Sequence, residues 1–150
     1  MKKAFILLLF FITSCGYQPI YQNTNLRNFE FKEIIFDNSN YIDRKILNSL
    51  SIKKNDKDDV ENIFHISSSY EIKEISKNLK GQVELYKDII NVNIKIQNKE
   101  NKIIKNKNFS KEFTYNNKEN KFELTEYQKS LKDNLIDKIL NDIVIYLNSE

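Results

Sequence analysis

In FHISSSYEIK, residues 64–73, apolar and polar side chains alternate. Its even-numbered residues are apolar except for Ser68, whereas its odd-numbered residues are all polar. Successive side chains of a β-strand point to opposite faces of a sheet. This period of two therefore predicts a long strand with one buried face and one solvated face.

The same alternation recurs twice further along the chain. Alternate residues are apolar at Tyr86, Ile90, Val92, Ile94 and Ile96, and again at Phe109, Phe113 and Tyr115. Residues 76–82 form the first predicted turn, in which Gly81 suits a positive backbone dihedral. Residues 98–101 (NKEN) form the second. Connections this short rule out parallel crossovers, so the three segments predict an antiparallel meander.

The N-terminal part of the domain predicts a strand followed by a helix. Residues 29–37 (FEFKEIIFD) begin with alternating aromatic and charged side chains, which favours a half-buried strand. Turn and N-cap residues follow at 37–40. Apolar residues then recur at helical spacing over about 41–51, which predicts a short amphipathic helix. The polar run at 53–59 (KKNDKDD) predicts a loop.

The C-terminal segment predicts a long helix over about 125–148. Thr125 and Gln128 have the spacing of a capping box, and apolar residues form a broad stripe after them. A sheet with one apolar face and two amphipathic helices has one simple arrangement. We therefore expect an α+β fold, a two-layer sandwich in which a mainly antiparallel four-stranded sheet carries both helices on one face.

The first residues predict a processing signal that ends at the only cysteine. Lys2 and Lys3 precede nine apolar residues at 4–12 (AFILLLFFI), which is the layout of a secretory signal peptide. A membrane-spanning helix needs about 20 apolar residues, so this run is too short to be a permanent span. Residues 12–15 (ITSC) resemble a bacterial lipobox, in which small residues precede the cysteine that is acylated.

We therefore predict a signal peptide at 1–14, a lipidated leader at 15–28 and a folded domain at 29–150. Several acyl chains on Cys15 would give stable membrane anchoring, because one chain alone binds only reversibly. Gly16 stands where an aspartate would favour inner-membrane retention, so the outer membrane is the expected location. The alternative is an ordinary signal peptide followed by an incidental cysteine.

The net charge indicates which classes of partner the chain can bind. Without Lys2 and Lys3 the chain has 22 basic and 21 acidic residues, a formal charge of about +1. Nucleic-acid binders are usually far more basic on one face, so no nucleic-acid partner is expected. Five lysines nevertheless gather between residues 99 and 111. Two interpretations stay open, namely a solvated hairpin and a surface that meets an anionic partner.

Catalytic and metal-binding patterns are not found in the sequence. His65, Ser67 and Ser69 would share one strand face, but no Gly-rich elbow or orienting acid accompanies them. The acidic run DKDD at 56–59 lacks the glycine and the final glutamate of an EF-hand loop. We therefore expect no enzymatic activity, no metal and no cofactor.

The segment CGYQPIY, residues 15–21, resembles the mature start of the LptE family of lipopolysaccharide-assembly lipoproteins. The order strand, helix, strands and long C-terminal helix is similar to that family over the whole mature chain. The segment FSKEFTYN, residues 109–116, resembles the family's last strand.

The resemblance implies a non-enzymatic role. LptE-like proteins plug the outer-membrane β-barrel LptD, help it assemble and bind lipopolysaccharide on its way to the outer leaflet. By their position, Lys77, Lys80, Lys105 and Lys107 are the predicted lipopolysaccharide contacts. One alternative is a pilot or scaffold lipoprotein of another envelope machine. Another is a lipid-anchored esterase that uses Ser67 or Ser69 with His65.

Overall fold

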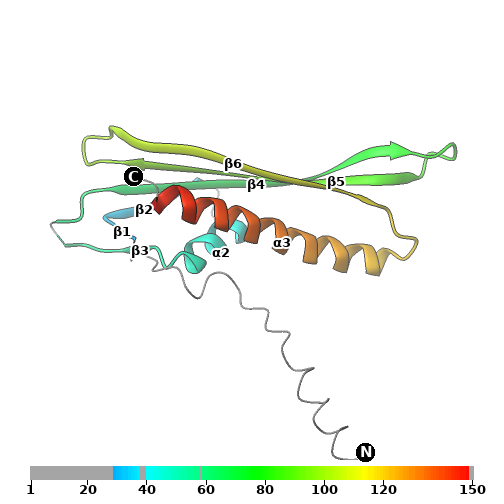
Figure 1. Cartoon of the computed structure of the whole chain (residues 1–150), viewed down its shortest axis with the longest axis horizontal. Coiled ribbons are helices and arrows are strands. Elements are labelled where there is room, and N and C mark those ends of the chain that lie inside the picture. Colours follow the sequence, from blue (N-terminus) through cyan, green and yellow to red (C-terminus); the bar gives the residue numbers. More distant parts are fainter. Residues whose placement is uncertain (1–28, 38–39, 58, 149–150) are drawn as a thin grey trace, which may run out of the picture.

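The computed structural model describes residues 29–37, 40–57 and 59–148. Its main sheet has the strand order β2-β4-β5-β6, formed by Glu33–Phe36, Ile63–Lys77, Val83–Gln97 and Ile103–Asn116. A two-stranded sheet pairs β1 (Glu30–Phe31) with β3 (Lys53–Lys54). The helices α2 (Tyr41–Ser49) and α3 (Lys121–Asn148) lie against one face of the main sheet (Figure 1). The predicted α+β two-layer fold is therefore confirmed.

The signal peptide predicted at 1–14 and the leader predicted at 15–28, with Cys15, lie outside the described residues. The predicted domain boundary at residue 29 stays a prediction.

The three long strands form the predicted meander. β4 pairs antiparallel with β5, and β5 pairs antiparallel with β6. Both hairpins have the same construction, in which an asparagine opens the turn and its side-chain oxygen accepts two backbone N–H groups. Asn78 does this in the first turn and Asn98 in the second. The fourth turn residue has a positive φ, 77° at Gly81 and 60° at Asn101, a conformation that glycine and asparagine tolerate best.

The N-terminal segment differs from the prediction in two ways. The single strand predicted at 29–37 is divided at Lys32, whose backbone N–H donates to the carbonyl of Asn62 at 2.8 Å. β1 consequently pairs with β3, which lies inside the predicted 53–59 loop. β2 pairs parallel with β4, because α2 carries the chain back across the sheet before β4 begins.

The C-terminal helix begins earlier than predicted. α3 starts at Lys121, where the Asn120 side chain accepts the backbone N–H groups of Phe122 at 2.9 Å and Glu123 at 3.4 Å. The predicted capping box at Thr125 and Gln128 is wrong. Thr125 donates its hydroxyl to the carbonyl of Lys121 inside the helix, and Gln128 reaches the sheet.

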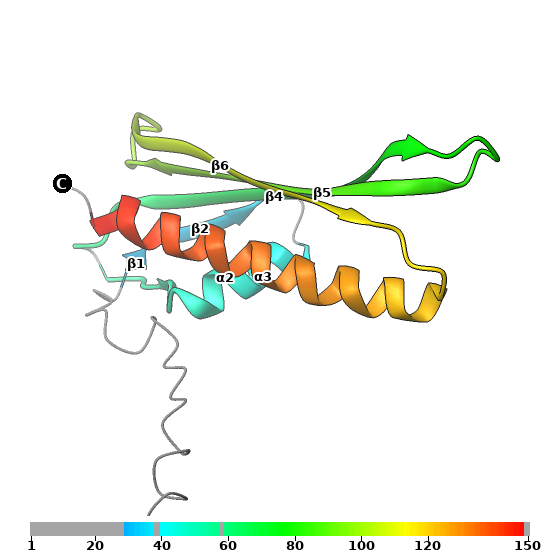
Figure 2. The same ribbon diagram turned by 45° about the vertical axis from the view of Figure 1, so that its right-hand side comes forward.

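The core lies between the sheet and the two helices (Figure 2). From the sheet, Phe64, Ile66, Ile90, Val92 and Ile94 are fully buried. From the helices, the fully buried residues are Ile46 of α2 and Leu135, Ile136, Ile139, Leu140 and Ile143 of α3. The predicted apolar stripe of the long helix is therefore core, and each such side chain contributes about 1.5–3 kcal/mol on burial.

Asn40 caps α2, and its loss is a testable change. Its side-chain oxygen accepts the N–H groups of Ile42 and Asp43, and its amide donates to the Ser68 carbonyl at 3.0 Å. We expect Asn40→Ala to lower the free energy of unfolding by about 1–2 kcal/mol, measured by urea denaturation. Asn48→Ala, on the exposed side of the same helix, should change it by less than about 0.5 kcal/mol. Equal losses in both variants would contradict the capping role.

Candidate functional site

The sheet face opposite the helices carries mainly polar side chains. In the register of β4 and β5, His65 lies opposite Lys95, Ser67 opposite Asn93 and Ser69 opposite Asn91. β6 continues these rows with Asn106, Asn108 and Ser110. A shallow hollow of about 170 Å³ at the centre is lined by serine and asparagine side chains. This face therefore offers hydroxyl and amide groups to water or to a polar partner.

His65, Ser67 and Ser69 do share a face, as the alternation predicts. Within the described ranges, however, the buried His65 Nε2 has no hydrogen-bond partner, so neither serine bonds to it there. An activated serine needs its hydroxyl bonded to the base and the base bonded to an orienting acid. Among the described residues, His65 has neither a serine hydroxyl nor an acid as a hydrogen-bond partner at Nε2.

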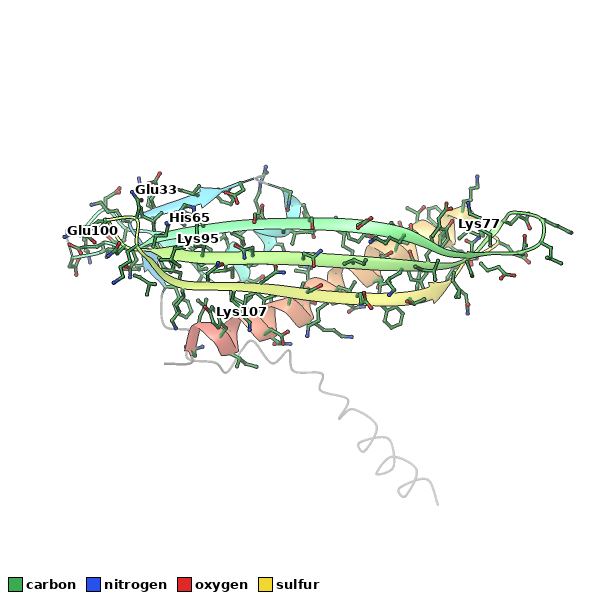
Figure 3. The ribbon with its side chains drawn as sticks, turned by 90° about the horizontal axis from the view of Figure 1, so that it is seen from above. Glu33, His65, Lys77, Lys95, Glu100 and Lys107 are labelled. Atoms are coloured by element: carbon green, nitrogen blue, oxygen red, sulfur yellow. The ribbon has the colours of Figure 1, made fainter. Side chains whose placement is uncertain are left out.

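The four lysines predicted to bind lipopolysaccharide do not form one cluster. Lys77 lies opposite Val83 at one end of β5, and Lys107 opposite Ile94 towards the other end (Figure 3). At about 3.3 Å per residue, these two lysines are about 35 Å apart along the strands. Lys80 belongs to the turn beside Lys77, and Lys105 to the same strand as Lys107. One phosphate group therefore cannot contact both pairs.

The two pairs also differ in their surroundings. The Lys77 ammonium lies 2.8 Å from the Glu74 carboxylate, and this hydrogen bond raises the pKa of Lys77. Lys80 is exposed at the turn. Lys105 lies over the Tyr146 ring, with 5.5 Å from Nζ to the ring centroid, whereas Lys107 is exposed. The first pair belongs to the β4–β5 hairpin, whereas the second lies on β6 at the edge of the sheet.

A groove of about 1080 Å³ separates the β4–β5 hairpin from the start of α3. We call it the distal groove. Its lining includes Asn78 and Gln82 from the turn, Tyr86 from β5, and Lys121 and Leu124 from α3. Leu79 is fully exposed at the hairpin tip, and Ile75 and Phe122 are also exposed nearby. Two lysines and two glutamates also line the groove, namely Lys118, Lys121, Glu84 and Glu119. The distal end thus combines charged, amide and apolar side chains, as an amphiphilic ligand would require.

Beneath α3, a buried carboxylate accepts two tyrosine hydroxyl groups. Tyr70 donates to Asp88 Oδ2 at 2.6 Å, and Tyr115 donates to Asp88 Oδ1 at 2.7 Å. Gln128 of α3 donates to the Tyr115 oxygen at 2.8 Å. Burial and the bond to Asp88 raise the pKa of both phenols, so they stay protonated donors. These hydrogen bonds, which connect α3 to β4, β5 and β6, were not predicted from the sequence.

A second buried carboxylate, Asp43 of α2, predicts a measurable pH dependence. Burial raises the pKa of Asp43, a nearby Asp37 adds to this, and hydrogen bonds from Ser68 and Asn40 only partly oppose it. The folded state therefore keeps this proton to a higher pH than the unfolded state. The stability that protonated Asp43 confers is fully present below pH 3.8 and is lost as the pH rises through the raised pKa of the folded state. The free energy of unfolding of Asp43→Asn, taken relative to that of the parent, should therefore be higher at pH 7 than at pH 3.5.

Asp133 of α3 provides a control with the opposite sign. Burial alone would raise its pKa, but the bonded Lys45 ammonium at 2.7 Å outweighs burial and lowers the pKa. Its stability contribution is present above pH 3.8 and is lost as pH falls through the lowered value. Asp133→Asn should therefore lose stability against the parent at pH 7, and less at lower pH. Urea denaturation from pH 3 to 7 measures the difference in the free energy of unfolding between each variant and the parent. If this difference changes with pH in the same direction for both variants, both assignments are contradicted.

No helix in the described ranges has the length and hydropathy that a membrane crossing requires. Those residues also contain no group of three or more His, Cys, Asp or Glu side chains suited to a metal ion.

Comparison with known proteins places the fold. The chain matches no protein-family model and no curated protein sequence. Its structure is similar to that of rare lipoprotein B from Shewanella oneidensis, with a TM-score of 0.53 and 16% sequence identity, covering 76% of this chain and 95% of that one.

Two further solved structures have the same likeness. For lipoprotein B from Nitrosomonas europaea the TM-score is 0.56 at 14% identity, covering 77% of this chain and 80% of that one. For a minor lipoprotein from Acinetobacter baumannii it is 0.52 at 11% identity, covering 78% and 92%. At such low identity the likeness establishes a shared fold.

Proposed function

We propose that this chain is an outer-membrane lipoprotein of the LptE type, anchored through acyl chains on Cys15. In this role it plugs and helps assemble an LptD-type β-barrel and binds lipopolysaccharide during transport to the outer leaflet. One observation carries the proposal. A lipobox-like segment ending at Cys15 precedes a domain whose fold is shared with three proteins named as lipoproteins.

The surface chemistry supports a place inside a water-lined lumen. The helices bury the apolar face of the sheet, and the opposite face carries mainly serine, asparagine and charged side chains. Such polar side chains can hydrogen-bond to water or to a polar lumen wall, so their contact with the wall does not leave them unsatisfied. Its described elements form one compact two-layer unit with a single apolar core (Figure 2).

The distal groove is the proposed contact for lipopolysaccharide. Lys118 and Lys121 line it. Lys77 and Lys80 belong to the β4–β5 hairpin, whose turn forms one side of the groove. Lysine ammonium groups bind phosphates as mobile point charges, and the exposed Leu79 and Ile75 offer apolar side chains on the same hairpin. The pair Lys105 and Lys107, about 35 Å away along the strands, would need a separate phosphate.

Co-purification tests the barrel partnership. The full chain, tagged at its C-terminus and solubilised from the cells that produce it, should recover a β-barrel of LptD type in near-stoichiometric amount. Recovery of a secretion or peptidoglycan complex in its place would favour the pilot or scaffold alternative. A Cys15→Ala chain is a useful comparison, because binding of the barrel without acyl chains would separate anchoring from plugging.

Binding of purified lipopolysaccharide tests the ligand. We expect Lys77→Gln/Lys80→Gln to weaken binding of the full chain by about three- to tenfold, because each exposed charge pair is worth at most about 1 kcal/mol. Lys129→Gln/Lys138→Gln, on exposed positions of α3, is the matched control and should bind like the parent. Equal weakening in both would indicate only a loss of net charge.

The esterase alternative has a direct test. It predicts hydrolysis of short-chain ester substrates that disappears in His65→Ala. Our proposal expects no turnover in the parent chain, and hydrolysis that depends on His65 would overturn the non-enzymatic assignment.

A further inference from the structure

β6 is the edge strand of the main sheet. It pairs with β5 on one side, and no described strand pairs with its other side. Alternate residues of an antiparallel edge strand direct their N–H and C=O groups away from the sheet. Fourteen residues long, β6 therefore presents a row of unpaired backbone groups, which is a template for another strand.

The other edge of the sheet is less suitable as a template. β2 covers only the first four residues of β4. The rest of β4 carries mixed charges that pair with one another, Lys73 with Glu71 and Lys77 with Glu74. Its pairing register also shifts between Glu74 and Lys77, and such bulges disrupt an edge. β6 is regular from Lys105 to Asn116.

The charge along β6 has one sign over most of its length. Residues 102–111 (KIIKNKNFSK) contain four lysines and no acidic residue. Lys105, Lys107 and Lys111 lie at alternate positions and so share one face, the face towards α3. Lys111 is bonded to Asp142 of α3 at 2.6 Å. Lys107 is exposed and forms no ion pair within the described part of the chain.

An apolar shelf accompanies the lysines on the same side. A groove of about 490 Å³ lies between β6 and the last turns of α3. Phe109 forms one side of it, and Tyr146 and Ile145 form the other. Ile145 is 69% exposed, so its side chain is open to an apolar contact from a partner.

We propose that the β6 edge binds an extended acidic segment of a partner protein by strand addition. The added strand would pair its backbone with β6. Its acidic side chains would lie beside Lys105 and Lys107, and the next side chain on the same face would be apolar and would rest on Phe109 and Ile145. The inference stands apart from lipopolysaccharide binding at the distal groove and does not require the partner to be the barrel.

The lysines also disfavour a second copy of this chain as the partner. Two β6 strands in antiparallel register about Asn108 would place Lys105 of each copy opposite Lys111 of the other. Like charges opposite one another destabilise a strand pair. Lysines on an edge strand therefore oppose self-association while leaving the edge open to an acidic strand.

Hydrogen–deuterium exchange of the full chain in detergent micelles tests the proposal. The probe is a capped synthetic peptide in which threonine alternates with glutamate, glutamate and valine, in the order that matches Lys105, Lys107 and Phe109. We expect saturating peptide to slow exchange of edge-facing amides within 105–111 by at least about tenfold. The same peptide N-methylated at alternate amides, and a peptide with lysine in place of glutamate, should not slow it.

Charge variants complete the test. Lys105→Glu/Lys107→Glu should weaken binding of the acidic peptide by about tenfold, because two attractive lysine–glutamate contacts are replaced by two repulsive glutamate–glutamate contacts. Lys129→Glu/Lys138→Glu, on α3, should weaken it by less than about twofold. Lys105→Gln/Lys107→Gln covers the case in which the charge reversal prevents folding, and should give an intermediate loss.

Three outcomes would overturn the proposal. One is equal protection by the N-methylated peptide, and another is protection confined to the 78–82 turn. The third is protection of β6 by lipopolysaccharide micelles but not by the peptide, which would make this edge a lipid site. None of these outcomes bears on co-purification of the barrel, so the two proposals fail separately.

Discussion

Replacing Tyr70 and Tyr115 together with phenylalanine should destabilise the domain by about 3–5 kcal/mol, the largest loss we expect from removing only two oxygen atoms. Asp88 between them is 0% exposed, and the two tyrosine hydroxyls occupy both of its oxygens. Within the described ranges no cationic side chain forms an ion pair with this carboxylate, so the phenols are the donors that offset its burial.

Each single variant should lose less, about 1.5–2.5 kcal/mol, because one donor remains. Tyr115→Phe should be the more costly of the two, since it also leaves the Gln128 amide without its acceptor. Urea denaturation of the full chain in detergent measures all three losses.

A rescue variant separates charge from packing. Adding Asp88→Leu to the double variant removes the unpaired carboxylate and fills its volume with apolar atoms. We expect this triple variant to regain most of the lost stability, because replacing a whole buried polar group is often nearly neutral. A triple variant as unstable as the double would show that the phenol oxygens act through packing, and the proposed charge argument would fail.

Cys15→Ala should abolish acylation and processing altogether. The predicted mature chain begins at Cys15, which in our proposal is the acylated residue. Without the thiol, the chain should incorporate no labelled palmitate and should keep residues 1–14. Metabolic labelling and intact mass spectrometry measure the two effects.

Thr13→Ser is the matched control for this change. It keeps a small residue before the cysteine and should be labelled and cleaved like the parent. The prediction also covers membrane attachment, because several acyl chains at about 0.8 kcal/mol per buried methylene hold a protein stably. Palmitate found in the Cys15→Ala chain would contradict the anchor assignment and with it the proposed location.

The long strands were predictable because local alternation alone specifies them. In 64–73 and 86–96 one face is apolar and the other polar, and only one register buries the apolar face. The N-cap at Asn40 was equally local. The parallel pairing of β2 with β4 was not predicted, because no local pattern says which strand a segment pairs with.

The start of α3 shows how two local signals compete. Asn120 and Thr125 both suit an N-cap, and Phe122 in the first turn is exposed, so the apolar stripe gives no sign of that turn. Asp88 was missed for a different reason. Alternation places it between Tyr86 and Ile90 on the apolar face, and a carboxylate there should have indicated buried donors nearby.

The lysine site could be predicted only in part. Lys77 and Lys80 do lie at an exposed turn, and Lys105 and Lys107 do lie near the second hairpin. Their separation follows from the length of the strands between the two turns. The edge position of β6 follows from strand order, a tertiary property that no spacing in the sequence encodes.

The 15-residue strands β4 and β5 also limit which changes in length this chain can accept. Deleting one residue within β5 would turn every later side chain of that strand to the opposite side, so Ile94 would meet water and Asn93 the interior. Homologous chains should therefore gain and lose residues in the turns and in the segment before β4. Within the paired strands β4 and β5, insertions and deletions should be nearly absent.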